Sequence, residues 1–448
     1  MGADAREIVH ALRKHPQAPK IGGKIIILGV VTENSNNGKI FLQDLERELD
    51  GYLTPEILSP TGLLCTDQKD RKYDAAILSN VLVGQNWIED QEKIAEFIVT
   101  LIKLLRDGAV VIIRENLVEH SAHMISHLTK LLDMFVAKDR SHLGRFDFYT
   151  ARQVRDSIYA HSNFLDIFWT LCVKHTEVTE KNSESETTFR EFLDKTQYTE
   201  DNVKSYEWIF GTDFISPGGI NENRRILRKF TDIYPGQRML DIGVGIGGGA
   251  RQAAREFGLH VLGCDLSSNM IMHAFERNQR DRDHRVEYQI ADALTYQHEP
   301  ITFDLVFSRD CIQHIENIPL LFKNIYTWLK PGGEVLITMY GKGYGELSPK
   351  FLEYVRQRQY HLRNIDEIGQ LATDAGFVNV HVENITSRFE EILREERHKT
   401  VDNKADFLQN FGEEMFNKLI HSWEDKIGFI KDDNHNWLLL RALKPKLE

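Results

Sequence analysis

The sequence has no run of apolar residues long enough to cross a membrane, and its first twenty residues lack the continuous apolar core of a secretory signal. Its four cysteines, Cys65, Cys172, Cys264 and Cys311, include no CxxC pair. We therefore expect reduced thiols, with neither a disulfide framework nor a metal site. These absences favour a cytoplasmic protein that does not insert into membranes.

An excess of positive charge is also missing, because the formal net charge is −12. Proteins that bind a phosphate polymer gain their affinity from Lys and Arg, so this charge argues against nucleic acid as a partner. The composition is that of a globular protein with a core, at 42% hydrophobic and 27% charged residues. A small-molecule partner is expected, and nothing in the sequence points to an obligate protein partner.

A chain of 448 residues is too long for one hydrophobic core, which predicts two domains. Residues 175–188 are almost wholly polar and rich in Ser, Thr and Glu, the composition of a solvated connector. We expect a first domain over residues 1–180, a polar linker over residues 181–195 and a second domain over residues 196–448.

Both halves alternate apolar runs with amphipathic segments, a pattern typical of a parallel sheet covered by helices. In the first half we expect strands at residues 25–31, 73–78 and 109–113 and a helix at 89–105. In the second half we expect strands at residues 238–242, 260–264, 285–290, 303–307 and 334–339. The fold class is α/β, with a doubly wound, mostly parallel, Rossmann-like sheet in the second half.

The two halves also resemble each other. Residues 73–79 parallel residues 303–308, and residues 104–108 parallel residues 328–332. Repetition of a strand and of the turn that precedes another strand suggests an internal duplication.

Residues 239–249 place an acid, Asp241, at the end of a hydrophobic strand and several glycines in the following turn. Gly243, Gly245 and Gly248 fit the GxGxxG pattern of dinucleotide-binding folds. This motif alone leaves a nicotinamide cofactor and S-adenosylmethionine equally open.

Two further acids, Asp265 and Asp292, follow the next two strands. Each acid taken singly could be a helix N-cap. Negative charge beside the glycine turn opposes a pyrophosphate but suits a sulfonium with its amino group, so the three acids together favour S-adenosylmethionine. Residues 27–33 of the first half offer a single glycine, and we expect a methyltransferase-like first domain that has lost its cofactor loop.

Residues 197–219, 308–314 and 354–360 closely resemble the phosphoethanolamine N-methyltransferases, and the resemblance covers nearly all of residues 190–448. With a degenerate first half and an intact second half, the chain is most similar to the second nematode type of this family. The resemblance implies a class I methyltransferase that methylates phospho-monomethylethanolamine and phospho-dimethylethanolamine to phosphocholine, a phospholipid precursor. The products also include S-adenosylhomocysteine, and no metal is required.

The resemblance also implies roles for individual residues. Tyr198 and His314 match the pair that takes the proton from the amine before in-line methyl transfer. The cofactor positions, with Asp241 added from the strand pattern, are Ile215, Ser216, Asp241, Gly243, Asp265, Leu266, Asp292, Ala293 and Arg309. The substrate positions are Gln197, Tyr206, Asp310, Tyr340, Tyr354, Arg358, Tyr360 and Lys426.

Several alternatives stay open at this point. Ala293 is smaller than the aliphatic residue often found there, Tyr206 could simply pack in the core, and residues 354–360 could be an ordinary charged helix face. The whole chain could instead be a nicotinamide-dependent oxidoreductase, or a methyltransferase-like protein that binds ligands without catalysis.

Overall fold

The computed structural model describes residues 2–29, 36–64, 71–81, 90–116, 134–135, 143–153, 166–175 and 188–446. The chain forms two compact units, the first comprising Met1–Thr188 with Asn278–Asp281 and the second comprising Phe189–Arg277 with Arg282–Glu448. Cys65, residues 30–33 of the first half and residues 181–187 of the expected linker lie outside the described residues. Residues 189–195 of that linker are helical, in α7 (Phe189–Phe192) and the π-helix η2 (Leu193–Gln197).

The second unit contains a seven-stranded sheet in the order β9-β8-β7-β10-β11-β13-β12. Its strands run parallel except β13, which is antiparallel to both neighbours. Their bounds are β7 Arg238–Ile242, β8 His260–Asp265, β9 Val286–Ala291, β10 Phe303–Arg309, β11 Leu329–Gly341, β12 Val378–Asn384 and β13 Asn436–Leu443. The expected α/β class and doubly wound sheet are confirmed, and β12 and β13 are additions that the sequence did not predict.

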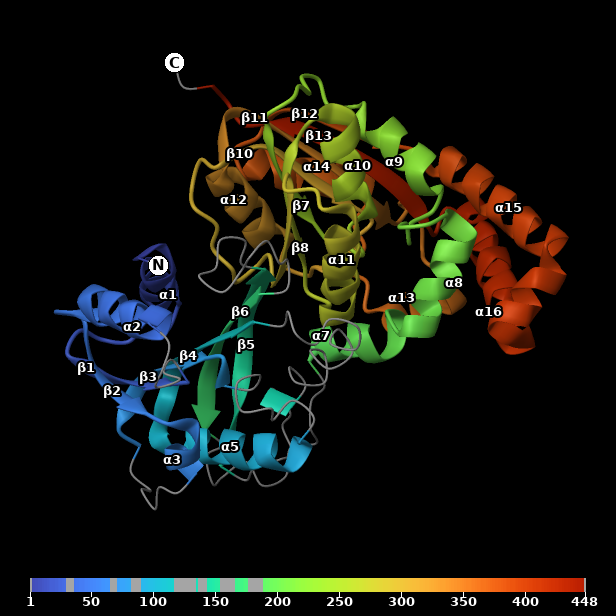
Figure 1. Ribbon diagram of the computed structural model, residues 1–448. Coiled ribbons are helices and arrows are strands. Elements are labelled where there is room, and N and C mark those ends of the chain that lie inside the picture. The colour runs from blue at the N-terminus through green and yellow to red at the C-terminus, as the bar shows by residue number, and fades with distance from the viewer. Residues whose placement is uncertain are drawn as a thin grey trace. The chain divides into compact units, whose positions relative to one another are not determined.

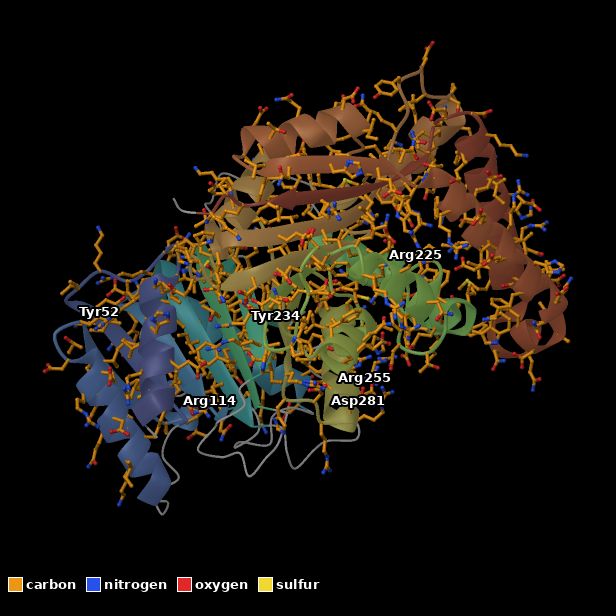
Figure 2. The ribbon with its side chains drawn as sticks, turned by 90° about the horizontal axis from the view of Figure 1, so that it is seen from above. Tyr52, Arg114, Arg225, Tyr234, Arg255 and Asp281 are labelled. Atoms are coloured by element: carbon orange, nitrogen blue, oxygen red, sulfur yellow. The ribbon has the colours of Figure 1, made fainter. Side chains whose placement is uncertain are left out.

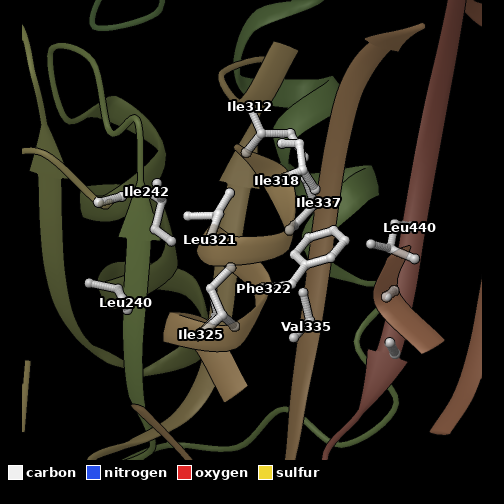
Figure 3. Packing of buried hydrophobic residues seen from close by; sticks show 14 of the residues in the cluster. Leu240, Ile242, Ile312, Ile318, Leu321, Phe322, Ile325, Val335, Ile337 and Leu440 are labelled. Atoms are coloured by element: carbon white, nitrogen blue, oxygen red, sulfur yellow. The ribbon is translucent and has the colours of Figure 1, made fainter. Parts of the chain in front are cut away.

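Helix α12 (Ile318–Trp328) shows how this sheet is covered. Its Leu321, Phe322 and Ile325 are fully buried or nearly so, at the spacing of one helix face. Figure 3 shows them lying between Leu240 of β7 and Leu440 of β13. One face of the helix therefore covers the sheet from β7, in its middle, to the antiparallel strand β13.

The other helices of the second unit form two groups. The first comprises α10 (Gly248–Phe257), α11 (Ser268–Asp281) and α14 (Ile365–Asp374). A second group comprises α8 (Glu200–Phe210), α9 (Gly219–Leu227), α13 (Pro349–Arg358), α15 (Thr386–Asp402) and α16 (Lys404–Lys431). Within this group α15 packs against both α8 and α16 (Figure 1). Among the described residues, no helix combines the length and apolar character that crossing a membrane requires.

The first unit has a six-stranded sheet in the order β2-β1-β3-β4-β6-β5. Strands β1 to β4 are parallel, and β6 is antiparallel to β4 and β5. The strands are β1 Gly23–Leu28, β2 Leu53–Leu58, β3 Tyr73–Ser79, β4 Leu105–Asn116, β5 Gly144–Gln153 and β6 Asp166–His175, and the helices are α1 Gly2–Lys14, α2 Asn36–Leu49, α3 Pro60–Leu64 and α5 Gln91–Leu104. Among the described residues this order equals that of the second unit without a counterpart of β9.

The two sheets share their register residue by residue. Asp74 of β3 accepts a 2.8 Å hydrogen bond from the N–H of Lys24, and Asp304 of β10 accepts one of the same length from Arg238. At the other end of these strands, the Asn80 N–H donates to the Arg114 carbonyl (Arg114 is labelled in Figure 2), as Asp310 does to Thr338. Asn80 and Asp310 even share a positive φ, of 50° and 54°. This correspondence supports the internal duplication suggested by the sequence.

Candidate active site

A cavity of about 800 Å³ lies in the second unit, where β7, β8, β9 and β10 end. Between β7 and β10 the chain order of the sheet reverses, and ligands of open α/β sheets bind at such a point. All but one of the predicted site residues line this cavity: Gln197, Tyr198, Tyr206, Ile215, Ser216, Asp241, Gly243, Asp265, Leu266, Asp292, Ala293, Arg309, Asp310, His314, Tyr340, Arg358, Tyr360 and Lys426. Tyr354 packs behind the lining, with its ring 5.9 Å from Tyr360 and 6.0 Å from Phe351.

The three acids lie at the ends of β7, β8 and β9. Burial and the charge of Asp265 raise the pKa of Asp241 to about 8, and burial raises the pKa of Asp265 to about 6. Burial also raises the pKa of Asp292. Carboxylates that are costly to ionise in an empty cavity are stabilised by a cationic ligand. This end of the cavity therefore selects a positively charged group.

The acids also bind the backbone of the turns that follow their strands. Asp265 accepts 2.9 Å hydrogen bonds from the N–H groups of Gly245 and Ser267, and Asp292 accepts one of 2.8 Å from Leu294. These are turn contacts and not helix N-caps, because α11 begins only at Ser268 and the described residues between β9 and β10 contain no helix. The carboxylate of Asp265 is held in a fixed orientation toward the cavity.

Gly243 shows why the loop after β7 needs glycine. Its φ is +76°, a left-handed conformation that other residues rarely adopt, and a Cβ atom would lie 2.3 Å from the Sγ of Cys311. The loop backbone can therefore approach the residues after β10 closely.

Asp194 of η2 connects the segment before α8 to the cofactor loop. It accepts hydrogen bonds from the hydroxyls of Ser267 and Ser268 and from the N–H groups of Ser268 and Asn269. The Asn269 amide in turn donates to the Tyr198 carbonyl at 2.9 Å. Asp194 thereby caps α11 from a distant part of the chain, and the Asn269 side chain ties the Tyr198 backbone to the start of the same helix.

His314 lies in the short 3₁₀ helix η3 (Ile312–His314). Its ring packs between Phe189, at 5.5 Å, and Tyr360, at 4.8 Å. Burial, with the positive charges of Arg358 and His361, lowers the pKa of His314 to about 3. The imidazole is therefore neutral at pH 7 and can accept a proton. Burial raises the pKa of Tyr198, so its phenol stays protonated.

Two cations, Arg358 and Lys426, lie among tyrosines on α13 and α16. Burial and the charge of Arg358 lower the pKa of Lys426 to about 8. The Tyr340 and Tyr360 rings are 5.9 Å apart beside them, and Gln197 donates to the Arg358 carbonyl at 3.4 Å. Two buried cations that repel each other favour a bound anion, and these side chains can donate to its oxygens.

Hydrogen bonds to Arg309 and Glu396 hold the segment after α8 in place. Arg309 donates to the carbonyls of Pro217 and Gly219, the latter at 3.2 Å, and Glu396 of α15 accepts a 2.6 Å hydrogen bond from the Gly218 N–H. Arg309 therefore lines the cavity and also supports the turn that carries Ile215 and Ser216.

Nearby, Glu222 of α9 binds Arg225 (labelled in Figure 2) and Arg388 of α15, which fixes α9 against α15. Neither Glu222 nor Glu396 was predicted, because contacts between distant segments, such as Glu222 with Arg388 and Glu396 with the Gly218 N–H, leave no pattern in the sequence.

Comparisons with known proteins give the family. The model of the N-terminal region of phosphoethanolamine N-methyltransferase 2 matches residues 2–177, and a general methyltransferase-domain model matches residues 239–333. Phosphoethanolamine N-methyltransferase 2 of Caenorhabditis elegans is 49% identical over 378 residues, which are 84% of this chain and 85% of that protein. The chain belongs to the phosphoethanolamine N-methyltransferase 2 family.

Solved structures agree with this assignment. The Haemonchus contortus member of the phosphoethanolamine N-methyltransferase 2 family, in complex with phosphomonomethylethanolamine and S-adenosylhomocysteine, matches with a TM-score of 0.90 and 41% identity over the full length of both chains. The phosphoethanolamine N-methyltransferase of Plasmodium falciparum is 36% identical over 256 residues, 56% of this chain and 95% of that protein.

The predicted resemblance is thus confirmed, and the fold is that of the class I methyltransferases with the N-terminal region of this family. Membership also decides between the enzyme classes that the glycine motif left open, in favour of a methyltransferase and against a nicotinamide-dependent oxidoreductase.

Proposed function

We propose that the second unit transfers a methyl group from S-adenosylmethionine to the nitrogen of phospho-monomethylethanolamine and phospho-dimethylethanolamine, yielding phosphocholine. The observation that carries this proposal is that acidic and basic side chains line different parts of one cavity. Asp241, Asp265 and Asp292 lie at one end, and Arg358 and Lys426 lie among tyrosines elsewhere in its lining. A sulfonium nucleoside fits the acids, and a phosphate monoester fits the cations.

The cofactor supplies an electrophilic methyl group on a positively charged sulfur. Asp241 would hold its amino group, Asp265 its ribose hydroxyls and Asp292 its adenine amine, with Gly243 giving the backbone access to the ligand. Ile215, Ser216, Leu266 and Ala293 would complete its contacts, and Arg309 would keep the Ile215–Ser216 turn in place. These residues all line the same cavity, which supports the assignment.

The substrate needs a base, because an alkylammonium with a pKa of about 10 is protonated at neutral pH. Asp310 would bind the ammonium, and His314, neutral and buried, would accept its proton so that the nitrogen lone pair attacks the methyl carbon. A low pKa makes His314 a weak base in the empty cavity. Burial is the main cause of this low pKa, and a phosphate bound at Arg358 would offset the positive charge that adds to it.

Tyr198, whose backbone is tied through Asn269 to the start of α11, would hydrogen-bond to the same nitrogen and orient it. Gln197 and Tyr206 belong to the segments that cover the cavity and would close over the substrate. Tyr340, Arg358, Tyr360 and Lys426 would bind the phosphate oxygens. Tyr354, which packs against Tyr360, would support this group from behind.

The first unit would no longer bind the cofactor. In the shared register, Ile27 of β1 takes the place of Asp241, and Ser59 after β2 takes the place of Asp265. Ile27 is fully buried, and an apolar side chain there offers nothing to a charged nucleoside. Calorimetric titration of the full chain with S-adenosylhomocysteine should give one site per chain, and two sites would contradict this assignment.

We also propose a cytoplasmic setting and small-molecule partners. Cys172, Cys264 and Cys311 are free thiols in the described part of the chain, as in reducing compartments. The net charge of −12 disfavours nucleic acid, and nothing here points to an obligate protein partner.

The direct test follows methyl transfer from labelled S-adenosylmethionine to ethanolamine phosphate and to its mono-, di- and trimethylated forms, with products identified by mass spectrometry. We expect transfer to the mono- and dimethylated substrates. Binding of both ligands without transfer would instead identify a non-catalytic member of the family.

A further inference from the structure

Asp310 lies where β10 ends, in a left-handed backbone conformation that is strained for residues other than glycine. Its φ is 54°, in the left-handed region, and its N–H donates to the Thr338 carbonyl at 2.9 Å. The side chain is almost fully buried, and burial raises the pKa of its carboxyl group. An isolated acid in this position would be free to turn and to protonate.

The two carboxylate oxygens of Asp310 have different surroundings. Oδ1 accepts hydrogen bonds from the indole Nε1 of Trp437, at 2.7 Å, and from the Thr338 hydroxyl, at 2.9 Å. Oδ2 is buried and has no hydrogen-bond partner in the described part of the chain. The nearest cation, Arg309, places its Nε 3.8 Å from Oδ2 and donates its terminal N–H groups to backbone carbonyls.

Trp437 is itself firmly held. It is fully buried in β13, its ring packs 5.4 Å from Phe389, and its backbone N–H donates to the Thr386 hydroxyl at 2.9 Å. In the antiparallel pairing it lies opposite Tyr340 of β11, two residues beyond Thr338. The antiparallel strand pair thus delivers both donors to the same oxygen.

We propose that Trp437 and Thr338 are positioning residues that occupy Oδ1 of Asp310, so that the carboxylate presents Oδ2 to the ammonium of the phosphobase. This inference rests on the proposed function, since it takes Asp310 as the group that meets the ammonium. Two donors to one oxygen fix the plane of the carboxylate and favour its charged form. The remaining oxygen keeps its share of the negative charge and accepts no hydrogen bond in the described part of the chain, with the Arg309 Nε as its ion-pair neighbour at 3.8 Å.

A purely structural role makes a different prediction. A buried indole N–H needs an acceptor in any case, so Trp437 could bind Asp310 for the stability of the fold alone. Its loss would then lower the unfolding temperature without changing the discrimination between ligands that carry an ammonium and ligands that do not.

The test compares the affinity of three ligands for Trp437→Phe, which keeps an aromatic ring and removes the N–H. The ligands are phospho-monomethylethanolamine, ethyl phosphate, which lacks the ammonium, and S-adenosylhomocysteine. We expect the KM and Kd of the phosphobase to rise about tenfold, the order expected for a hydrogen bond to a charged group. The Kd values of ethyl phosphate and S-adenosylhomocysteine should not change.

Trp328→Phe is the matched control, because Trp328 is also fully buried but its Nε1 has no hydrogen-bond partner. It should leave all three affinities unchanged. Thr338→Val provides an independent removal of the second donor, with Thr338→Ser as the conservative rescue, should Trp437→Phe fail to fold. Unchanged phosphobase affinity, or equal weakening of ethyl phosphate, would overturn the inference. A wild-type protein that transfers no methyl group would instead overturn the proposed function.

Discussion

The charge of Asp265 reaches Asp241 and contributes, after burial, to raising the pKa of Asp241 to about 8. At pH 7 the ligand-free protein therefore holds a proton on Asp241. A ligand whose cationic amino group meets this carboxylate must displace the proton.

Cofactor binding should consequently release protons. Asp241 is protonated in the free protein below pH 8 and ionised in the complex, so S-adenosylmethionine affinity should rise with pH up to about 8 and level off above it. Calorimetry at pH 7 in buffers of different ionisation enthalpy should detect release of about one proton. In Asp241→Asn the release should vanish and affinity should fall about 10- to 100-fold. Binding without proton release in the wild type would contradict this assignment.

Loss of the proposed base should lower the rate of methyl transfer without changing cofactor affinity. His314→Ala should lower kcat by about 10²- to 10⁴-fold while the Kd of S-adenosylhomocysteine stays unchanged. Tyr198→Phe should also lower kcat, by a smaller factor, because the phenol orients the nitrogen and does not take the proton. His421→Ala is the control, since His421 is an exposed histidine of α16. Wild-type turnover in both active-site variants would remove the proposed base.

The phosphate site should show the opposite proton balance. In the free cavity Lys426 loses its charge as the pH rises through about 8, whereas a bound phosphate raises this pKa. Phosphobase affinity should therefore decline above pH 8, with proton uptake on binding. Lys426→Met should raise the KM of the phosphobase about 10- to 100-fold and leave cofactor affinity intact. The exposed Lys431 of the same helix provides the control, as Lys431→Met, and a similar change there would refute the assignment.

The repeated aspartates should act as stability elements of their own units. Asp304→Ala removes a hydrogen bond to the Arg238 N–H and an ion pair with Lys330 at 2.8 Å, and Asp74→Ala removes the equivalent contacts to Lys24 and Arg106. Each side chain is partly exposed, so each loss should be about 1 kcal/mol. Chemical denaturation followed by hydrogen exchange should localise each effect to one unit, and methyl transfer by Asp74→Ala should match the wild type.

Much of the second unit follows from local pattern. The five strands predicted from the sequence are apolar runs with turns at their ends, and the residues at or after those ends, such as Asp241, gather at one edge because these strands run parallel. Strands β12 and β13 were missed because they add on antiparallel after long helical segments, without the alternation of a βαβ unit. In β12 the burial is also partial, so that no clear apolar run marks it.

The residues that hold the site residues in position could not be predicted from the sequence, for a different reason. Asp194 and Ser267 are 73 positions apart, and Trp437 and Asp310 are 127 apart. Single contacts of this kind depend on the finished packing and have no periodicity. The π-helix at Leu193–Gln197, which gives Asp194 and Tyr198 their directions, likewise falls in a stretch that reads as the end of a polar connector.

The common register of the two sheets has an evolutionary consequence. The aspartates that anchor the amino-terminal edge, Asp74 and Asp304, persist in both copies, whereas at the opposite edge the acid of one copy is an isoleucine, Ile27, in the other. A duplication of one ancestral sheet would keep the border that serves folding in both copies and free the border that serves chemistry to diverge. The first unit could then lose an ancestral reaction while it kept its architecture.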